Sequence, residues 1–141
     1  MAGNTDRWLA AALIAAAVPA HAASVACHVT YGGETQIIRA AATTQPLTVA
    51  PVAIGSYFLF RIVFRREPAD LATIRLSTYA GRDEGPAIIH QATYPYPPPV
   101  AAVHGFTGLN FVYEPVRDGE LQYWCEPVRQ RRPWYLMSQA R

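Results

Sequence analysis

The side chains best suited to redox, metal or nucleophilic chemistry are two cysteines and a few histidines. Cys27 and Cys125 are the only cysteines, and His28, His90 and His104 are the histidines beyond residue 22. A thiol pair can form a disulfide or ligate a metal, and a thiol beside a histidine can act as a nucleophile. The compartment decides among these chemistries, because disulfides persist under oxidising conditions.

The N-terminal residues 1–22 predict export. Arg7 precedes the uncharged apolar stretch 8–18, which is shorter than the roughly 20 residues that a helix needs to span a bilayer. Pro19 would end a helix there, and the Ala-His-Ala that follows places small residues at the two positions that signal peptidase recognises. We therefore expect residues 1–22 to be a cleaved secretory signal, and the mature chain to be periplasmic or secreted.

Cys27 has two predicted fates, depending on how the signal is removed. Residues 24–27, SVAC, loosely resemble a lipoprotein box, and that processing would anchor the chain through a lipidated Cys27. Such a box normally has a bulky apolar residue where Ser24 stands, so cleavage after Ala22 is favoured. We then expect a disulfide between Cys27 and Cys125, with two free thiols or a metal-bound pair as the alternatives.

The mature chain has the pattern of short strands separated by turns. Apolar and polar residues alternate with the period of a half-buried strand along most of its length. Gly32-Gly33 and Asp118-Gly119 are typical of hairpin turns. The strongest strand is 56–65, whose alternate residues from Phe58 to Phe64 share one face and predict the core. Strands are expected at 25–31, 35–39, 47–52, 56–65, 73–80, 87–94, 109–113 and 121–125.

These strands predict an all-β domain over residues 23–127. Short strands at about ten-residue spacing, with no convincing helix, favour an antiparallel β-sandwich with immunoglobulin-like topology. The disulfide would tie the first strand to the last. The proline-rich segment 94–100 predicts a crossing or an exposed loop, and residues 128–141, with four arginines and no acid, predict a flexible basic and aromatic tail.

Composition argues against several functional classes. The formal net charge is only +2, which does not fit a nucleic-acid-binding protein. The most apolar mature stretch, 47–64, is interrupted by proline, glycine and arginine, so we expect no transmembrane segment. The serines lie outside any nucleophile elbow, and the acidic pairs Asp83-Glu84 and Asp118/Glu120 lie in predicted turns. We therefore expect a non-enzymatic protein without a cofactor.

Metal binding is the sharper alternative. A blue-copper site needs a histidine soon after its cysteine, but no histidine follows Cys125, which excludes that arrangement. A looser copper or zinc site built from His28, His90 and His104, with Met137 as a further ligand, is the alternative that the sequence leaves open.

Aromatic residues are concentrated in the C-terminal half. Strand alternation places Tyr123 and Trp124 on opposite faces, so one of these faces is exposed or covered by another part of the chain. The aromatics could form the core beneath the proline-rich loop, or they could form a recognition surface for a protein or a glycan. The residues are Tyr94, Tyr96, Phe106, Phe111, Tyr113, Tyr123, Trp124, Trp134 and Tyr135.

The sequence as a whole predicts an exported binding or accessory module of the bacterial cell envelope. We expect it to recognise a protein partner through its aromatic, proline-rich C-terminal half. In the tail, arginines beside aromatic residues could instead rest on an anionic membrane surface or form a frayed end. The candidate partner-binding residues are Tyr94, Tyr96, Trp124, Arg131, Arg132, Trp134 and Tyr135.

Overall fold

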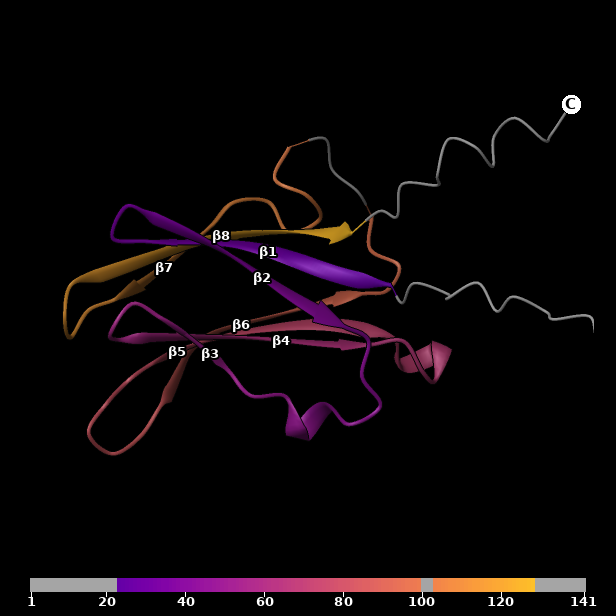
Figure 1. Ribbon diagram of the computed structural model, residues 1–141, viewed down its shortest axis with the longest axis horizontal. Coiled ribbons are helices and arrows are strands. Elements are labelled where there is room, and N and C mark those ends of the chain that lie inside the picture. The colour runs from indigo at the N-terminus through magenta and orange to yellow at the C-terminus, as the bar shows by residue number, and fades with distance from the viewer. Residues whose placement is uncertain (1–22, 100–102, 129–141) are drawn as a thin grey trace, which may run out of the picture.

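The computed structural model describes residues 23–99 and 103–128, which form two antiparallel four-stranded sheets. The expected signal at 1–22 and the tail beyond residue 128 lie outside the described residues. Sheet A has the strand order β2-β1-β8-β7, and sheet B has the order β3-β4-β5-β6 (Figure 1). The elements are β1 (Ser24–Tyr31), β2 (Glu34–Ala41), η1 (Pro46–Thr48), β3 (Val52–Ile54), β4 (Phe58–Arg65), η2 (Ala69–Leu71), β5 (Thr73–Ala80), β6 (Ala87–Pro95), β7 (Asn110–Glu114) and β8 (Gly119–Val128).

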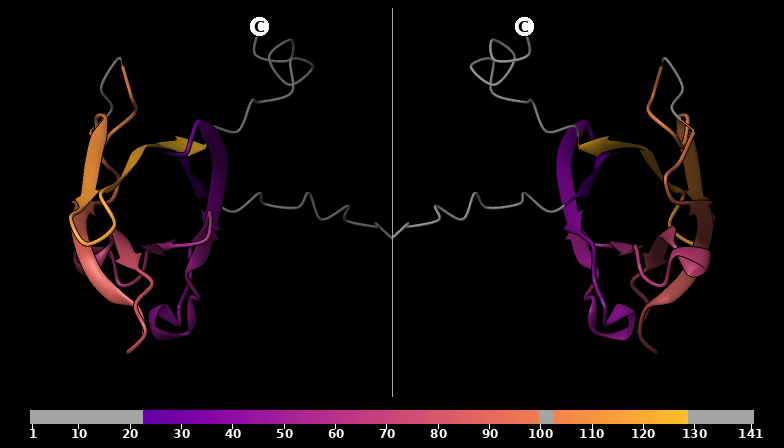
Figure 2. Two further views of the ribbon diagram at one scale, coloured as in Figure 1. Left: turned by 90° about the vertical axis from the view of Figure 1, so that its left-hand side faces the viewer. Right: turned by 90° about the vertical axis from the view of Figure 1, so that its right-hand side faces the viewer.

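The strands follow one another in an up-and-down order. Neighbours within each sheet are consecutive in sequence, except that β1 pairs with β8 and so joins the first and last of these strands. The two sheets curve around a shared interior when viewed along the length of the molecule (Figure 2). Immunoglobulin domains instead place their first, second, fifth and fourth strands in one sheet, so the strand order does not support the immunoglobulin-like topology expected from the sequence.

The core is built from the residues that alternation predicts. On β4, Phe58 is 1% exposed, Phe60 is fully buried and Ile62 is 3% exposed. Tyr123 of β8 is also fully buried, and its ring packs on Phe60 with 5.1 Å between centroids. These contacts join the inward faces of sheets A and B, so the predicted core face of β4 is confirmed.

The first hairpin turn lies at Gly32-Gly33, as the sequence predicts. In contrast, the strand predicted at 47–52 is wrong. Gly32 and Gly33 have φ angles of 60° and 82°, which a type I′ turn requires and glycine adopts without cost. The predicted strand 47–52 is replaced by the 3-10 turn η1 and the shorter strand β3. Pro46 begins η1 and Pro51 precedes β3. Proline fixes φ and lacks the N–H that a sheet ladder needs, which explains why no strand spans 47–52.

The predicted disulfide is present. Cys27 on β1 and Cys125 on β8 lie directly opposite each other with their Cα atoms 4.0 Å apart, and both side chains are fully buried. Neither cysteine is a free thiol, so the free-thiol and metal-bound alternatives are wrong. The Sγ atom of Cys27 is already bonded to Cys125, so this fold also contradicts the alternative in which Cys27 carries a lipid.

Removing the disulfide should destabilise the domain without changing its fold. The bridge joins residues separated by 98 positions, and the chain-entropy model gives about 4 to 5 kcal/mol for a closed loop of that size. We expect the double variant Cys27→Ala/Cys125→Ala to lose a free energy of unfolding of this order in urea titrations. Dithiothreitol should lower the stability of the wild type but not of the double variant. An unchanged urea midpoint in the double variant would contradict the stapling role of this bridge.

Candidate functional site

The outward face of sheet A is the candidate site, because it is rich in exposed apolar and aromatic side chains. Tyr123 and Cys125 point inward and are fully buried, so Trp124 between them points outward. The sequence predicts that one face of this strand is exposed or covered, and the structure places the Trp124 face on the outside. Strand register therefore determines which aromatic residues are available for contact.

We call this surface the aromatic face, and define it by five residues that strand pairing places on the same side of sheet A. Ile37 of β2 lies opposite His28 of β1, and His28 lies opposite Trp124 of β8. On the other side of β8, Phe111 lies opposite Gln122 and Tyr113 lies opposite Glu120. Ile37 is 47% exposed, Phe111 58% and Tyr113 55%. These three exposed side chains lie on the outer strands β2 and β7, and the partly exposed His28 and Trp124 lie on the two strands between them. Apolar patches of this kind on an isolated domain often mark interaction sites.

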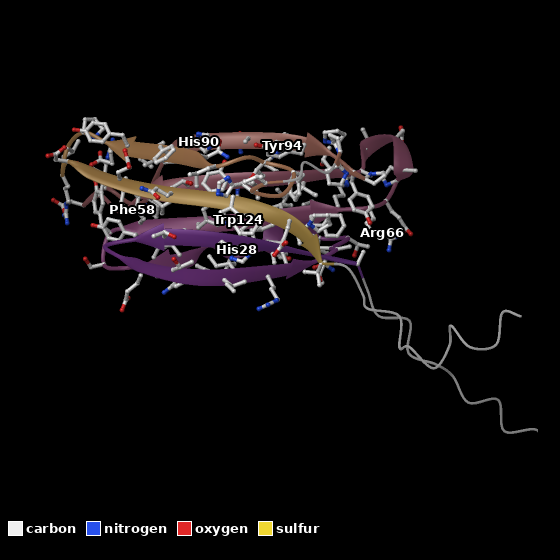
Figure 3. The ribbon with its side chains drawn as sticks, turned by 90° about the horizontal axis from the view of Figure 1, so that it is seen from above. His28, Phe58, Arg66, His90, Tyr94 and Trp124 are labelled. Atoms are coloured by element: carbon white, nitrogen blue, oxygen red, sulfur yellow. A yellow bond between two sulfur atoms is a disulfide. The ribbon has the colours of Figure 1, made fainter. Side chains whose placement is uncertain are left out.

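Two histidines hold the Trp124 ring in place. The His28 ring stacks on Trp124 with 3.8 Å between centroids and an interplanar angle of 3°, and His104 packs against it at 65° with 5.8 Å between centroids. Figure 3 shows Trp124 on β8 beside His28 on β1. His28 Nε2 also lies 2.9 Å from Glu126 Oε1, and it donates this hydrogen bond because a carboxylate only accepts. The indole is therefore a fixed part of the surface.

His104 reaches Trp124 because the chain before β7 runs close against β8. The Phe106 N–H donates to the Cys125 carbonyl at 3.0 Å, and the Cys125 N–H donates to Thr107 Oγ1 at 2.9 Å. Gly105, between His104 and Phe106 in the sequence, has a φ of 61°. Its backbone lies so close to β8 that an added Cβ would overlap the Cys125 carbonyl oxygen. Only glycine meets both requirements.

The edge of the aromatic face is mainly acidic. Glu120 and Glu126 extend from β8 on the outward side, and Asp118 lies in the turn beside them. The Tyr113 hydroxyl donates to Asp118 Oδ1 at 2.6 Å, and this hydrogen bond raises the pKa of the phenol. Arg39 of β2 is the one arginine that register places on this side of sheet A among the described residues. The face therefore carries a net negative charge.

His90 lies in a different environment from the other two histidines. Its Nε2 atom lies 2.7 Å from the hydroxyl of Tyr123, whose ring packs inside the core. Burial lowers the pKa of His90 and raises that of Tyr123, because a low-dielectric surrounding disfavours the charged form of each. The two groups form a hydrogen bond between sheets B and A. In Figure 3, His90 lies along β6 at a distance from His28 and Trp124.

The histidines do not converge on a metal site. His28 and His104 flank Trp124, whereas His90 bonds to Tyr123, which faces the opposite side of β8. Within residues 23–99 and 103–128, no three histidine, cysteine, aspartate or glutamate side chains lie close enough to hold a metal ion. Met137, the fourth ligand considered from the sequence, lies outside the described residues. The copper or zinc alternative gains no geometric support.

Other sequence candidates are distributed differently from Trp124. Tyr94 packs edge to face on Phe106 with 5.3 Å between centroids, and Tyr96 packs on Phe64 with 4.7 Å. Both tyrosines are partly buried against the core, so we do not include them in the aromatic face. The remaining candidates, Arg131, Arg132, Trp134 and Tyr135, lie outside the described residues.

Of the five residues of the aromatic face, only Trp124 is among the partner-binding residues predicted from the sequence. Phe111 and Tyr113 were noted there only as aromatic residues. Ile37 and Ile38 are consecutive on β2, so one of them must point outward, and the structure exposes Ile37 while Ile38 packs on the core. Two consecutive isoleucines in a strand are therefore the sequence feature that could have predicted an exposed apolar residue on β2. His28 was considered as a metal ligand, and its role as the stacking partner of Trp124 depends on the β1–β8 register.

The Glu114 carboxyl is a buried acid with a structural environment. It is fully buried, accepts a hydrogen bond from the Arg117 N–H at 2.9 Å, and lies 3.4 Å from the Arg82 guanidinium. Burial alone would raise its pKa, but hydrogen bonds from Arg117 and other donors outweigh that effect and hold the pKa below its usual value. These contacts tie the turn after β7 to the loop after β5.

Comparison of the chain with protein-family models, with curated proteins and with solved structures finds no match. Among the described residues, no helix is long and apolar enough to cross a membrane.

Replacing Gly105 should disrupt the support of the aromatic face. We expect Gly105→Ala to lower the free energy of unfolding by about 2 kcal/mol or more, because it combines an unfavourable φ with a backbone overlap. Gly108→Ala is the matched control, since Gly108 has a φ of 69° but nothing within 4 Å of an added Cβ. Chemical unfolding of both variants measures the difference. Equal losses would show that the close approach to Cys125 does not matter.

Acidification should destabilise the fold through the partly buried His90. Its pKa in the folded state is lowered from 6.5, so the unfolded chain binds more protons as the pH falls from that value towards the folded pKa. This histidine therefore contributes its full stability above about pH 6.5, and that contribution declines below it. His90→Gln should reduce the slope of unfolding free energy against pH between about 5 and 7. An unchanged slope in urea titrations across this range would contradict the assignment.

Proposed function

We propose that this protein is an exported, non-enzymatic binding module that recognises a protein partner through the aromatic face of sheet A. The observation that carries the proposal is the exposure of Ile37 on β2 and of Phe111 and Tyr113 on β7, on either side of the fixed Trp124. Rigid aromatic side chains are the commonest energetic anchors of protein interfaces. Burying them against a partner removes apolar surface from water at about 25 cal/mol per Å².

Two features favour a protein over a glycan as the ligand. Glycan recognition uses an open aromatic ring on which a sugar can stack, but His28 covers one face of the Trp124 ring and His104 packs against the same ring. The exposed side chains also come from different strands and include the aliphatic Ile37. A mixed aromatic and aliphatic patch with polar edges is the usual anatomy of a protein interface.

The charge of the face favours a different protein over a second copy of this chain. Asp118, Glu120 and Glu126 outnumber Arg39 on the outward side of sheet A. Two such faces would bring like charges together, which costs affinity. We therefore expect a partner surface that is apolar at its centre and basic at its edge.

The expected compartment fits this role. The Cys27–Cys125 bridge is the state that an oxidising compartment favours, and residues 1–22 carry the features of a secretory signal. We place the protein in the bacterial periplasm or outside the cell, where an accessory module of the envelope would meet its partner.

Site-specific crosslinking tests the proposal directly. A photoreactive benzoylphenylalanine replaces Phe111 in one protein and Ile88 in another. Ile88 is 54% exposed but lies on sheet B, which makes it a matched control. We expect position 111, but not position 88, to crosslink to a specific envelope protein in the producing cells. Failure of position 111 to capture any protein above the level of position 88 would contradict the proposal.

Binding to the purified partner then supplies the quantitative test. We expect Phe111→Ser to weaken the affinity by about tenfold or more, because truncating an aromatic anchor of an interface can cost more than about 1 kcal/mol. Ile88→Ser should bind like the wild type. Equal affinities for the two variants would exclude the aromatic face as the interface. If sedimentation experiments show a dimer that the Phe111→Ser substitution dissociates, the occupant of the face is a second copy of this chain. That result would overturn the proposal of a different protein.

A further inference from the structure

Sheet B differs from sheet A in its charge. The strands β3, β4, β5 and β6 contain three arginines and no aspartate or glutamate. The arginines are Arg61 and Arg65 on β4 and Arg75 on β5. In contrast, sheet A contains Glu34, Glu114, Glu120 and Glu126 but only one arginine. The positive charge is therefore separated from the aromatic face by the thickness of the molecule.

Strand register brings the three arginines together on the outward side of sheet B. The inward side of β4 carries its phenylalanines, so Arg61, Val63 and Arg65 alternate on the outward side. Arg75 lies opposite Val63, while Ser77 and Thr73 lie opposite Arg61 and Arg65. Arg75 is thus the diagonal neighbour of both other arginines, a spacing that long side chains can cover.

These side chains line a hollow with a volume of about 240 Å³. Its other walls are Val63 and Thr73 from the sheet, together with Pro46 and the exposed Leu47 of η1. The η1 turn lies on the side of sheet B that faces away from sheet A (Figure 1). The hollow is therefore small, positively charged, and closed on one side by an apolar turn.

The guanidinium groups have few partners within the protein. Among the described residues, the ion pairs are His28–Glu126 and Arg82–Glu114, and neither includes these three arginines. Arg61 lies over the Tyr79 ring at 5.5 Å, and its buried Nε atom has no hydrogen-bond acceptor. Arg65 uses its Nε atom to donate to the Glu67 carbonyl at 3.2 Å. A buried donor without an acceptor is uncommon in folded proteins, so the hydrogen-bonding capacity of the Arg61 guanidinium is not satisfied within the protein.

We propose that this hollow is a second binding site, which takes a dianionic phosphate group attached to an organic ligand. Guanidinium groups match the oxygens of phosphate with pairs of hydrogen bonds, and three of them together favour more than one negative charge. Leu47 and Val63 offer apolar contact to the organic part, and the Thr73 hydroxyl, which donates to the Leu71 carbonyl at 3.4 Å, also lines the hollow. The small volume favours one terminal phosphate over an extended polyanion. This site is independent of the aromatic face.

Two kinds of ligand carry such a phosphate group, namely a soluble phosphomonoester and a lipid with a phosphate headgroup. The protein for both tests is expressed from the full chain and purified after the cells have processed it. The soluble probes are inorganic phosphate and glycerol 1-phosphate, titrated by calorimetry and by the side-chain Nε–H signals of arginine in NMR spectra. The lipid probe is a phosphatidylcholine vesicle that contains phosphatidic acid, and cosedimentation measures its binding.

Two exposed arginines provide a matched pair of variants. Arg75→Gln removes one charge from the hollow, and Arg39→Gln removes the same charge from the outward side of sheet A, so both lower the net charge equally. We expect Arg75→Gln to weaken glycerol 1-phosphate binding by about tenfold, the usual scale for a charge-assisted hydrogen bond, while Arg39→Gln stays within about twofold. If Arg75→Gln perturbs folding, Arg65→Gln supplies the same comparison, and far-UV circular dichroism checks the fold.

Each outcome decides the proposal. Binding of glycerol 1-phosphate that depends on Arg75, without vesicle binding, identifies a soluble ligand. Vesicle binding that depends on Arg75 and that glycerol 1-phosphate displaces identifies a lipid headgroup. No binding of any probe at millimolar concentration, or equal loss in the Arg75→Gln and Arg39→Gln variants, would overturn the site. Polyglutamate serves as a control polyanion. Binding of polyglutamate without binding of either phosphate would also overturn the proposed site, because that result would indicate an extended acidic polymer as the ligand.

Discussion

The pairing of β1 with β8 is the interaction on which the rest of the structure depends. It joins the first and last described strands in one sheet, and the Cys27–Cys125 disulfide fixes its register. The register then sets His28 opposite Trp124, with the core-facing residues on the other side of the same strands. A shift of one residue would exchange the two faces. The bridge therefore stabilises the domain and, at the same time, determines which aromatic residues face outward.

The two sheets divide the chemistry of the molecule. Sheet A carries apolar and acidic side chains on its outward face, and sheet B carries arginines around a small hollow. The interior between them is largely apolar, with Glu114 and the His90–Tyr123 pair as polar contacts. Because the core is anchored by aromatic packing and a disulfide, the outward side chains of both sheets are free to differ. This separation allows one small domain to offer two unlike surfaces.

Much of the fold could be predicted from local patterns, because alternation and turn chemistry act over a few residues. The buried face of β4, the glycine turn at Gly32-Gly33 and the hairpin around Asp118 all lie where the sequence places them. The predicted strand 47–52 was wrong, since Pro46 before it and Pro51 within it favour a turn over a sheet ladder. The immunoglobulin-like topology was also unsupported. Strand order depends on which distant strands pair, and the alternation of apolar and polar residues within a strand does not specify its partners.

By itself, the sequence determined an all-β domain with a disulfide, an aromatic C-terminal half and opposite directions for Tyr123 and Trp124. Those properties follow from residue types and from the two-residue period of a strand. Only the tertiary structure decided that Trp124 faces outward between two histidines, that Tyr94 packs against the core, and that His90 lies apart from His28. It also brought Arg61 and Arg75 to one hollow. The place of Trp124 depends on the pairing of the distant strands β1 and β8. The other outcomes depend on strand register and on packing between the two sheets, which the local pattern of the chain does not encode.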